Sequence, residues 1–379
     1  MSDVVPDVTF MKQALRLAAR GRGTTSPNPM VGAMVVAKGK VVGSGYHKQA
    51  GGPHAEIFAL QQAKSQSQSR NATLYLTLEP CCHTEKRTPP CVPDIIHSGV
   101  SRVVVAMRDP NPQVAGRGIQ QLRRAGIVVD VGCLKHEAAK LNEVYVHWIK
   151  TGRPFVILKG AMTLDGKIAT AKGESKWITG PRAREHVHQL RSRVDVIAVG
   201  VNTVLKDDPQ LTVRLSAKKG QSNISRQPVR MVFDSRLRIP LTARVLQGIE
   251  QSPTAIATTK MASHKKIEQL RSMDIEVLVL PQKQNRVSIR RCLQELGSMG
   301  ITSLMVEGGS ELNASFLREG LVNQVCLYFA PVLLGGQDAK GLLGGLSPKH
   351  LGEKVAVSKL HLQYLGDDWL ITGDLRPKL

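Results

Sequence analysis

The hydrophobic positions along the first 150 residues change their period several times, and each change predicts a new element. From 8 to 20 the apolar residues form one broad helical face, with Asp7 able to cap its start and Gly21 just beyond its end. The β-rich segments 30–37 and 41–46 flank a turn at Gly39, which predicts a hairpin. Further strands are expected at 73–78, 102–107 and 127–131, with helical or turn segments at 54–63, 91–98, 117–125 and 136–149. This alternation predicts an α/β layer fold.

A second alternation begins at Thr151-Gly152-Arg153-Pro154, so a domain boundary is expected near residue 150. The length of 379 residues agrees with two domains, each able to bury its own core. Strands are expected at 155–159, 194–199, 230–233, 254–257, 277–280, 303–306 and 324–329, and helices at 181–192, 264–272, 288–298 and 310–319. The polar stretch 216–227 is expected to be an insertion loop. The second half therefore predicts another α/β domain.

The composition narrows the class of protein. Apolar residues make up 42% and charged residues 22% of the chain, which is typical of a soluble globular protein. No apolar run approaches the length of about 18 residues that a membrane span needs. The N-terminus shows no basic region followed by an apolar stretch, so no secretory signal is expected. We therefore expect a cytoplasmic protein without a membrane partner.

The formal net charge of +22 raises the question of a nucleic-acid partner. The excess is +9 in residues 1–150 and +13 in residues 151–379, so it is spread in proportion to length rather than gathered in a stripe. Aromatic residues, on which the bases of a single strand would stack, are only 4% of the chain. The charge therefore favours small anionic ligands over nucleic acid.

Three of the six cysteines, Cys81, Cys82 and Cys91, lie within eleven residues, which in a reducing compartment points to a metal or to catalysis. His54-Ala55-Glu56 followed by Glu79-Pro80-Cys81 matches the signature of zinc-dependent deaminases. One imidazole and two thiolates suit tetrahedral Zn²⁺ and leave a position for water. Glu56 can then accept and return a proton without being a ligand.

The second thiolate departs from the common spacing of that signature. Position 84, three residues after Cys81, is Thr, and the next cysteine is Cys91 after a longer loop. Cys82 and His83 remain alternative ligands on these grounds.

A second candidate site lies in Met305-Val306-Glu307-Gly308-Gly309-Ser310, where a strand runs into glycines and a hydroxyl at a helix start. Such a turn can hold a phosphate with backbone N–H groups and the helix dipole. The segments 159–166, 175–179 and 207–214 add donors, a carboxylate and an indole. Together they would suit a phosphorylated sugar beside a nicotinamide.

Several of these motifs resemble the bifunctional deaminase-reductase family of riboflavin biosynthesis. They are Thr-Leu-Glu-Pro-Cys at 77–81, Arg-Thr-Pro-Pro-Cys at 87–91 and Asp-Pro-Asn-Pro at 109–112, and the resemblance covers nearly the whole chain. It implies a cytidine-deaminase-like three-layer α/β domain at 1–150 that deaminates 2,5-diamino-6-(5-phosphoribosylamino)pyrimidin-4-one. It also implies a dihydrofolate-reductase-like α/β domain at 151–379 that reduces the ribosyl group to ribityl with NADPH, and a homodimer through the reductase halves.

For the deaminase site, the resemblance implies one Zn²⁺ held by His54, Cys81 and Cys91, with Glu56 as proton donor. Counting back from Cys91 favours Cys82, because this chain has one extra residue between the cysteines. We prefer Cys81, since a Pro-Cys helix start fixes a thiolate against the helix dipole while a loop can absorb an insertion. Asn28 resembles part of the substrate-pocket loop.

For the reductase site, the resemblance implies two sets of contacts. Cofactor contacts are implied for Ala161, Trp177, Thr203, Asp207, Ser235, Gly309, Ser310, Glu311, Leu312, Asn313, Ala314 and Ser315. Substrate contacts are implied for Ser175, Arg191, Leu211, Arg214 and Glu307. Because a guanidinium matches phosphate geometry at two points, we expect Arg191 and Arg214 to form a phosphate clamp.

The main alternative is a nucleic-acid-editing zinc deaminase with a non-catalytic C-terminal domain that binds or dimerises. The long spacing from Cys81 to Cys91 and the reductase motifs argue against it.

Overall fold

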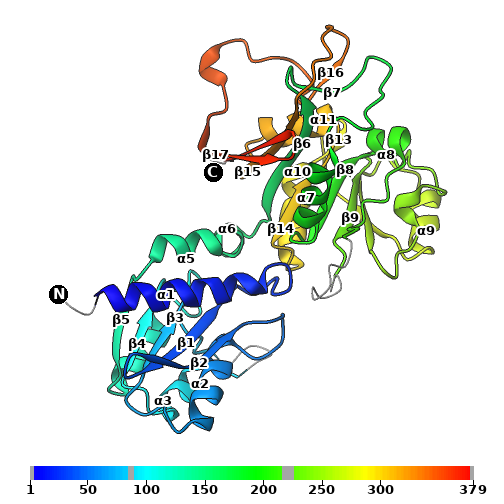
Figure 1. Cartoon of the computed structure of the whole chain (residues 1–379). Coiled ribbons are helices and arrows are strands. Elements are labelled where there is room, and N and C mark those ends of the chain that lie inside the picture. Colours follow the sequence, from blue (N-terminus) through cyan, green and yellow to red (C-terminus); the bar gives the residue numbers. More distant parts are fainter. Residues whose placement is uncertain (1–3, 84–88, 216–225, 376–379) are drawn as a thin grey trace. The chain divides into compact units, whose positions relative to one another are not determined.

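The computed structural model, shown in Figure 1, describes residues 4–83, 89–215 and 226–375. The chain divides into two compact units, Met1–Gly152 and Arg153–Leu379. Each unit is an α/β structure built around its own sheet, which confirms the predicted fold class. In the described part of the chain, no helix is long and apolar enough to cross a membrane.

The first unit has a five-stranded sheet in the order β2-β1-β3-β4-β5. Its strands are β1 (Gly32–Ala37), β2 (Lys40–Tyr46), β3 (Thr73–Leu76), β4 (Arg102–Val105) and β5 (Val128–Val131). β1 runs antiparallel to β2 and β3, whereas β3, β4 and β5 are parallel. The segments that leave β3 and β4 therefore start from the same edge of the sheet.

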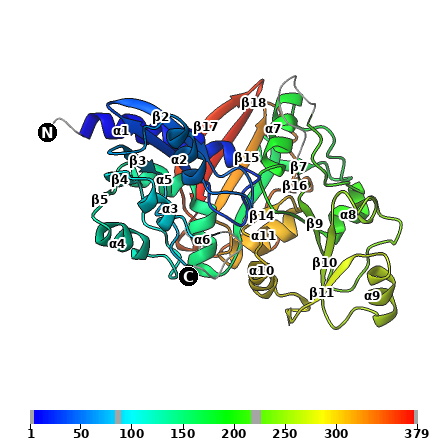
Figure 2. The ribbon, with the colours of Figure 1, turned by 90° about the horizontal axis from the view of Figure 1, so that it is seen from below.

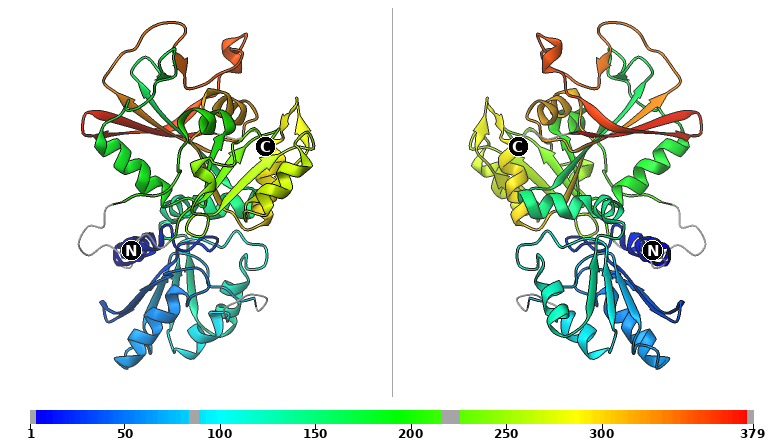
Figure 3. Two further views of the ribbon diagram at one scale, coloured as in Figure 1. Left: turned by 90° about the vertical axis from the view of Figure 1, so that its right-hand side faces the viewer. Right: turned by 90° about the vertical axis from the view of Figure 1, so that its left-hand side faces the viewer.

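Helices cover both faces of this sheet and make three layers (Figures 1 and 3). One core joins the sheet to α2 (Ala55–Ser65), α3 (Val92–His97) and α4 (Arg117–Arg124). The other joins it to α1 (Val4–Ala18), which continues into η1 (Ala19–Gly21), and to α5 (Lys135–Leu141) and α6 (Glu143–Thr151). Gly43 and Gly45 let α2 lie directly on β2, because a Cβ there would come within 2.1 Å of the carbonyl oxygen of Ala59 and 2.4 Å of that of Ala55.

The second unit has a nine-stranded sheet in the order β11-β10-β9-β8-β14-β6-β15-β18-β17. Its strands are β6 (Phe155–Thr163), β8 (Val196–Gly200), β9 (Val229–Phe233), β10 (Thr254–Thr258), β11 (Glu276–Val279), β14 (Ser303–Val306), β15 (Gln324–Ala330), β17 (Val357–Leu365) and β18 (Asp368–Leu375). The strands from β11 to β15 are parallel, whereas β18 is antiparallel to both neighbours. Figure 2 shows β17 and β18 beside β15.

Five helices and several short elements complete the described part of this unit. They are α7 (Pro181–Arg191), α8 (Val201–Asp207), η2 (Arg244–Leu246), α9 (His264–Arg271), α10 (Ile289–Ser298), α11 (Ser310–Arg318) and η3 (Leu351–Glu353), with the paired strands β7 (Lys167–Ala169) and β16 (Lys340–Gly341), and β12 (Gln282–Lys283) and β13 (Arg286–Val287).

Some sequence-based elements need correction. The first helix begins at Val4 rather than at residue 8. The helix expected at 136–149 is two helices that meet at Asn142, whose side-chain amide accepts a hydrogen bond from the Met30 N–H and donates one to the Met30 carbonyl. The strands β17 and β18 were not predicted, although the alternation of Leu360, Leu362 and Tyr364 carries a strand signal. Most of the predicted loop 216–227 lies outside the described residues.

Candidate active sites

Three predicted metal ligands converge in the first unit. His54 directly precedes α2, Cys81 follows β3, and Cys91 directly precedes α3. The Nδ1 atom of His54 lies 3.4 Å from Sγ of Cys81 and 3.1 Å from Sγ of Cys91, and the two sulfur atoms are 3.5 Å apart. The N–H of Cys91 donates to the carbonyl of Cys81 over 3.0 Å, which fixes the two cysteines together despite the loop between them.

The donor set and its size fit zinc. Tetrahedral Zn²⁺ with one nitrogen and two sulfur ligands holds those atoms about 3.6–3.8 Å apart. The three distances are a few tenths of an ångström shorter, so small side-chain rotations would admit the ion. In the described part of the chain, the group of potential metal ligands consists of His54, Cys81 and Cys91. Neither Cys82, which packs against the core of this unit, nor His83 belongs to it.

Glu56 lies in the first turn of α2, two residues after His54, and is buried. Its Oε2 atom has no hydrogen-bond partner among the residues that the structure describes. Burial raises the pKa of the Glu56 carboxyl above its usual range. A buried carboxyl beside the metal ligands, with one oxygen unengaged, is suited to carry a proton.

Asn28 is linked to the predicted metal ligands by His47, a residue that was not predicted. Its Nδ2 donates to Nε2 of His47 over 3.1 Å, and Nδ1 of His47 donates to the carbonyl of Pro53 over 3.1 Å. Because the Pro53 carbonyl can only accept, Nδ1 carries the proton of this hydrogen bond. Burial lowers the pKa of His47. The ring centroids of His47 and His54 are 5.3 Å apart.

Glu79 is a second residue for which no role was predicted, although it belongs to the Glu-Pro-Cys motif. It is buried, and its Oε2 accepts hydrogen bonds from the N–H groups of Asp109 (3.2 Å) and Gly116 (3.0 Å). Its Oε1 accepts one from the N–H of Ile119 over 3.3 Å. Glu79 thus ties the segment before Cys81 to the loop after β4 and to the start of α4.

Asp109, in that loop, is buried and carries a perturbed carboxyl. Its Oδ1 accepts hydrogen bonds from the Tyr145 hydroxyl and the Asn111 N–H, each over 2.9 Å. Burial raises its pKa to about 6 in spite of these bonds.

The second unit contains a cleft of about 1300 Å³ at the carboxyl ends of β8 and β9 and the start of α11. The predicted contacts that line it are Ser175, Thr203, Asp207, Ser235, Gly309, Ser310, Glu311, Leu312 and Ser315. Gly308 must be small, because a Cβ there would come within 2.9 Å of the Leu312 side chain. Gly309 and Ser310, at the N-terminus of α11, line the cleft, where the sequence predicts a phosphate-binding turn.

Four predicted cofactor contacts do not line this cleft: Ala161, Trp177, Asn313 and Ala314. Contact with the cofactor stays a prediction for all four residues. Asn313 and Ala314 differ from the other members of the turn 309–315, which line the cleft. They lie on the packed face of α11, where both are buried and Nδ2 of Asn313 donates to the Leu342 carbonyl. The Trp177 side chain is 70% exposed and lies under the guanidinium of Arg184, 4.7 Å from the ring centroid.

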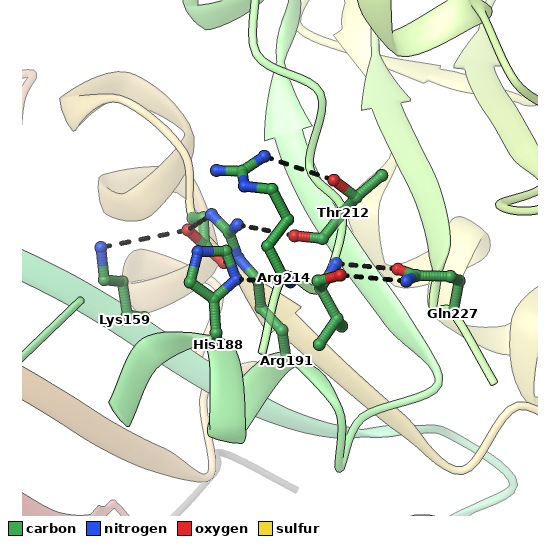
Figure 4. Close-up of polar contacts among 8 residues, drawn as sticks. Lys159, His188, Arg191, Thr212, Arg214 and Gln227 are labelled. Atoms are coloured by element: carbon green, nitrogen blue, oxygen red, sulfur yellow. Dashed lines mark hydrogen bonds and ion pairs between the residues drawn. The ribbon is translucent and has the colours of Figure 1, made fainter. Parts of the chain in front are cut away.

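The two arginines of the predicted phosphate clamp differ in their hydrogen bonds (Figure 4). Arg191 is not free, because its Nε donates to Oε1 of Glu307 over 2.6 Å and its Nη2 to Oε2 over 2.8 Å. Its Nη1 donates to the carbonyl of Thr212 over 3.1 Å. Arg214 is exposed and makes longer contacts with Gln210 and Thr212, so it is the arginine that keeps donors for an anion.

Around Arg191, a cluster of Lys159, His188, Glu307 and Arg214 shows pKa values that are shifted by burial and by neighbouring charges. Burial by itself would raise the pKa of Glu307, but Arg191 and the ammonium of Lys159, 3.9 Å away, outweigh it and lower the pKa to about 2. Nδ1 of His188 accepts the N–H of Arg214 over 3.1 Å. Burial, followed by the charges of Arg191 and Arg214, lowers the pKa of His188 to about 4. His188 and Lys159, both absent from the predicted site list, thus belong to the cluster.

Similarity to known proteins extends over both units. The family model described as the cytidine and deoxycytidylate deaminase zinc-binding region matches residues 5–107, and the RibD C-terminal domain matches residues 154–371. The chain is 46% identical over 365 residues to the riboflavin biosynthesis protein RibD of Actinobacillus pleuropneumoniae, covering 96% of this chain and 94% of that protein.

Solved structures agree with this relationship. Acinetobacter baumannii RibD, form 2, superposes with a TM-score of 0.88 at 37% identity, covering 99% of this chain and 100% of that one. A diaminohydroxyphosphoribosylaminopyrimidine deaminase/5-amino-6-(5-phosphoribosylamino)uracil reductase from Thermotoga maritima superposes with a TM-score of 0.83 at 35% identity, covering 99% of both chains.

Fold, metal-ligand cluster and similarity together define a zinc deaminase joined to a reductase. The chain belongs to the RibD family, the bifunctional deaminase-reductases of riboflavin biosynthesis. The alternative of a nucleic-acid-editing deaminase is not favoured, because the similarity continues through the second half as a reductase.

Proposed function

We propose that residues 1–150 form a zinc-dependent pyrimidine deaminase domain and residues 151–379 an NADPH-dependent reductase domain. The proposed substrates are the two phosphorylated pyrimidines in the name of the Thermotoga relative, deaminated first and then reduced in the ribosyl chain. This proposal rests on one observation. The potential zinc ligands His54, Cys81 and Cys91 lie together, and Glu56, two residues after His54, has a buried Oε2 atom without a hydrogen-bond partner among the described residues.

In the proposed deaminase site, His54, Cys81 and Cys91 hold the zinc ion, which supplies Lewis-acid chemistry when bound. Glu56 takes the proton of the attacking water at its carboxylate and delivers it to the departing amine. Asn28 and His47 present polar atoms from the neighbouring loop to the pyrimidine, and the hydrogen bond between them fixes their orientation.

In the proposed reductase site, NADPH supplies the hydride when bound, and the protein supplies orientation and charge. The cofactor residues that line the cleft are Thr203, Asp207, Ser235, Gly309, Ser310, Glu311, Leu312 and Ser315, with Ser175 on its wall for the substrate. Arg214 provides an exposed cation for the substrate phosphate, whereas Arg191 orients Glu307. Contact with the cofactor also stays a prediction for Ala161, Trp177, Asn313 and Ala314. Contact with the substrate stays a prediction for Arg191, Leu211 and Glu307.

The proposed partners are small phosphorylated pyrimidines rather than nucleic acids, because the positive charge is spread over both halves. A homodimer through the reductase halves is supported by β17, an edge strand that exposes Leu360 and Tyr364 at 66% and 65%. The proposed location is the cytoplasm. It is supported by the six cysteines, none of which is in a disulfide.

The test separates the two activities. Glu56→Gln should keep its zinc and its NADPH-dependent reduction of the deaminated intermediate, while deamination falls by about 10² to 10⁴, the usual worth of a positioned acid or base. The reciprocal variant Gly309→Val should weaken NADPH binding and leave deamination intact. If either substitution reduced both activities equally, two independent sites would be the wrong description.

A further inference from the structure

The turn that follows β9 forms one wall of the cleft and holds a carboxylate that is fully engaged. Asp234 is buried directly after the strand. Its Oδ2 accepts the N–H of Ile239 over 2.8 Å, and its Oδ1 accepts the N–H of Arg236 over 3.4 Å. The backbone carbonyl of Asp234 accepts the N–H of Leu237 over 3.2 Å. The acidic group at this strand end therefore stabilises its own turn.

Neighbouring elements hold the same turn from both sides. The Thr259 hydroxyl, just beyond β10, donates to the carbonyl of Ser235 over 2.8 Å. The N–H of Val287, in β13, donates to the Ser235 hydroxyl oxygen over 3.0 Å. That hydroxyl still has its own hydrogen to donate. Ser235 and Arg236, which both line the cleft, are thus mounted on a preorganised backbone.

The cations that line the cleft differ in their surroundings, and Arg236 is one of several, with Lys206, Arg318 and Lys340, that form no ion pair with a carboxylate among the described residues. Lys283 lies 3.5 Å from a carboxylate oxygen of Glu319, and Arg286 lies 3.4 Å from one of Glu311. Arg238 donates to the side-chain oxygen of Asn202 over 2.8 Å. Arg236 is exposed, and no carboxylate lies within ion-pair distance of its guanidinium in the described part of the chain. Its planar donors are available to an anion.

The position of Arg236 relative to the phosphate-binding turn suits a second phosphate. The sheet order places β8 between β14 and β9, so two strand spacings, about 10 Å, separate the turn before α11 from the turn after β9. In α/β nucleotide-binding sites, a free carboxylate beside the ribose accepts the 2′-hydroxyl of NAD, whereas an arginine there accommodates the 2′-phosphate of NADP. In the turn after β9, the Asp234 carboxylate holds the turn itself, and the Arg236 guanidinium has no carboxylate partner among the described residues.

We propose that Arg236, together with the Ser235 hydroxyl, binds the phosphate monoester on the adenosine ribose of the dinucleotide and so selects NADPH over NADH. This inference rests on the proposed reductase function of the second unit. It assigns cofactor selectivity to a residue outside the predicted set of contacts.

The experiment measures binding rather than turnover. Titration calorimetry at one fixed ionic strength compares 2′,5′-ADP with 5′-AMP, and NADPH with NADH, on the wild-type chain and on Arg236→Gln. Loss of hydrogen bonds to a charged phosphate should weaken 2′,5′-ADP and NADPH by about ten- to a hundredfold. The affinities for 5′-AMP and NADH should be unchanged. Arg271→Gln, an exposed position on α9 that does not line the cleft, removes the same charge and should leave all four affinities unchanged.

Each contrary result has a distinct meaning. If Arg236→Gln weakened the binding of 5′-AMP and NADH as much as that of 2′,5′-ADP and NADPH, the effect would be one of general charge and the proposal would be overturned. The same holds if Arg271→Gln weakened binding equally. Unchanged 2′,5′-ADP and NADPH binding in Arg236→Gln would overturn it while leaving the reductase function intact. A wild-type chain that binds neither NADPH nor 2′,5′-ADP would overturn the reductase function and this inference with it. Thermal unfolding of both variants checks that the fold is preserved.

Discussion

Arg191 at the end of α7 and Glu307 at the end of β14 form a two-point ion pair, with 2.6 Å between Nε and Oε1 and 2.8 Å between Nη2 and Oε2. Their side chains are only 13% and 7% exposed. Lys159 of β6 lies 3.9 Å from the same carboxylate. Three elements that are distant in sequence thus meet through one buried carboxylate, beside the exposed Arg214 (Figure 4).

Removing the charge of Glu307 should destabilise the second unit. Glu307→Gln leaves two buried cations facing a neutral amide, and breaking a buried pair in this way costs about 3–5 kcal/mol. Urea unfolding at pH 7 measures the change in the free energy of unfolding. The double variant Arg191→Met/Glu307→Leu should lose less than Glu307→Gln, because it removes both members of the closest pair. Equal losses would mean that the unpaired Arg191 is not the source of the cost.

The pH dependence of stability should include a contribution from His188. Its pKa in the folded state, about 4, is below its usual value of 6.5, so the unfolded chain binds the extra proton first. His188 therefore contributes stability above pH 6.5 that is lost as the pH falls through 4. His188→Asn keeps an acceptor for the Arg214 N–H without a titrating ring. Its free energy of unfolding should fall less between these pH values than that of the wild type, and parallel curves would contradict the prediction.

Zinc content should distinguish the neighbouring cysteines. Cys81→Ser and Cys91→Ser each remove a ligand from the cluster and should lose bound zinc, whereas Cys82→Ser should retain it. Elemental analysis of the dialysed proteins measures the metal directly. Loss of zinc from Cys82→Ser with retention in Cys81→Ser would reverse the ligand assignment.

Glu79 should stabilise the loop after β4 and the start of α4. The Glu79 carboxylate accepts hydrogen bonds from three backbone N–H groups. In Glu79→Gln, at least one of these N–H groups faces the amide N–H₂ instead of an oxygen. A buried donor without an acceptor costs about 1–3 kcal/mol. Hydrogen exchange should accelerate at Gly116 and Ile119. The matched change Glu137→Gln, on the exposed side of α5, should leave both amides protected. Unchanged exchange in Glu79→Gln would show that the loop is held by other contacts.

The exposed face of β17 should mediate dimerisation. Leu360→Glu places a charge among Leu360, Leu362 and Tyr364, and burying it against a second copy would be costly. Analytical ultracentrifugation should show a shift from dimer to monomer. Val279→Glu, an exposed apolar position on β11 at the opposite edge of the sheet, is the matched control and should remain dimeric. A dimeric Leu360→Glu protein would exclude this strand as the interface.

Local chemistry in the sequence was sufficient to predict much of the fold and both candidate sites. The apolar runs around Val103 and Leu304 predict buried parallel strands because such strands are apolar on both faces. Residue type and short-range motifs were enough to name candidate zinc ligands. His54 and Cys91 stand directly before helices, whereas Cys81 follows β3 and does not begin the helix that the Pro-Cys motif predicted. Gly308-Gly309 predicts a phosphate turn. The edge strand β17 was not predicted, although Leu360, Leu362 and Tyr364 alternate with polar residues as in a strand with one apolar face.

Other features depended on contacts between distant segments. The choice of Cys81 over Cys82 follows from which sulfur faces His54 once α2 and α3 pack on the sheet. The partner of Arg191 is 116 residues away in the chain, and only the position of β14 beside β8 brings Glu307 to it. In the same way, Glu79 finds its three N–H donors because β3 and β4 are parallel neighbours. The sequence by itself determined which groups can bind a metal or a phosphate, since that chemistry belongs to the residue. Only the tertiary structure decided which arginine is engaged and which stays free, since an ion pair forms where the fold brings opposite charges together out of water.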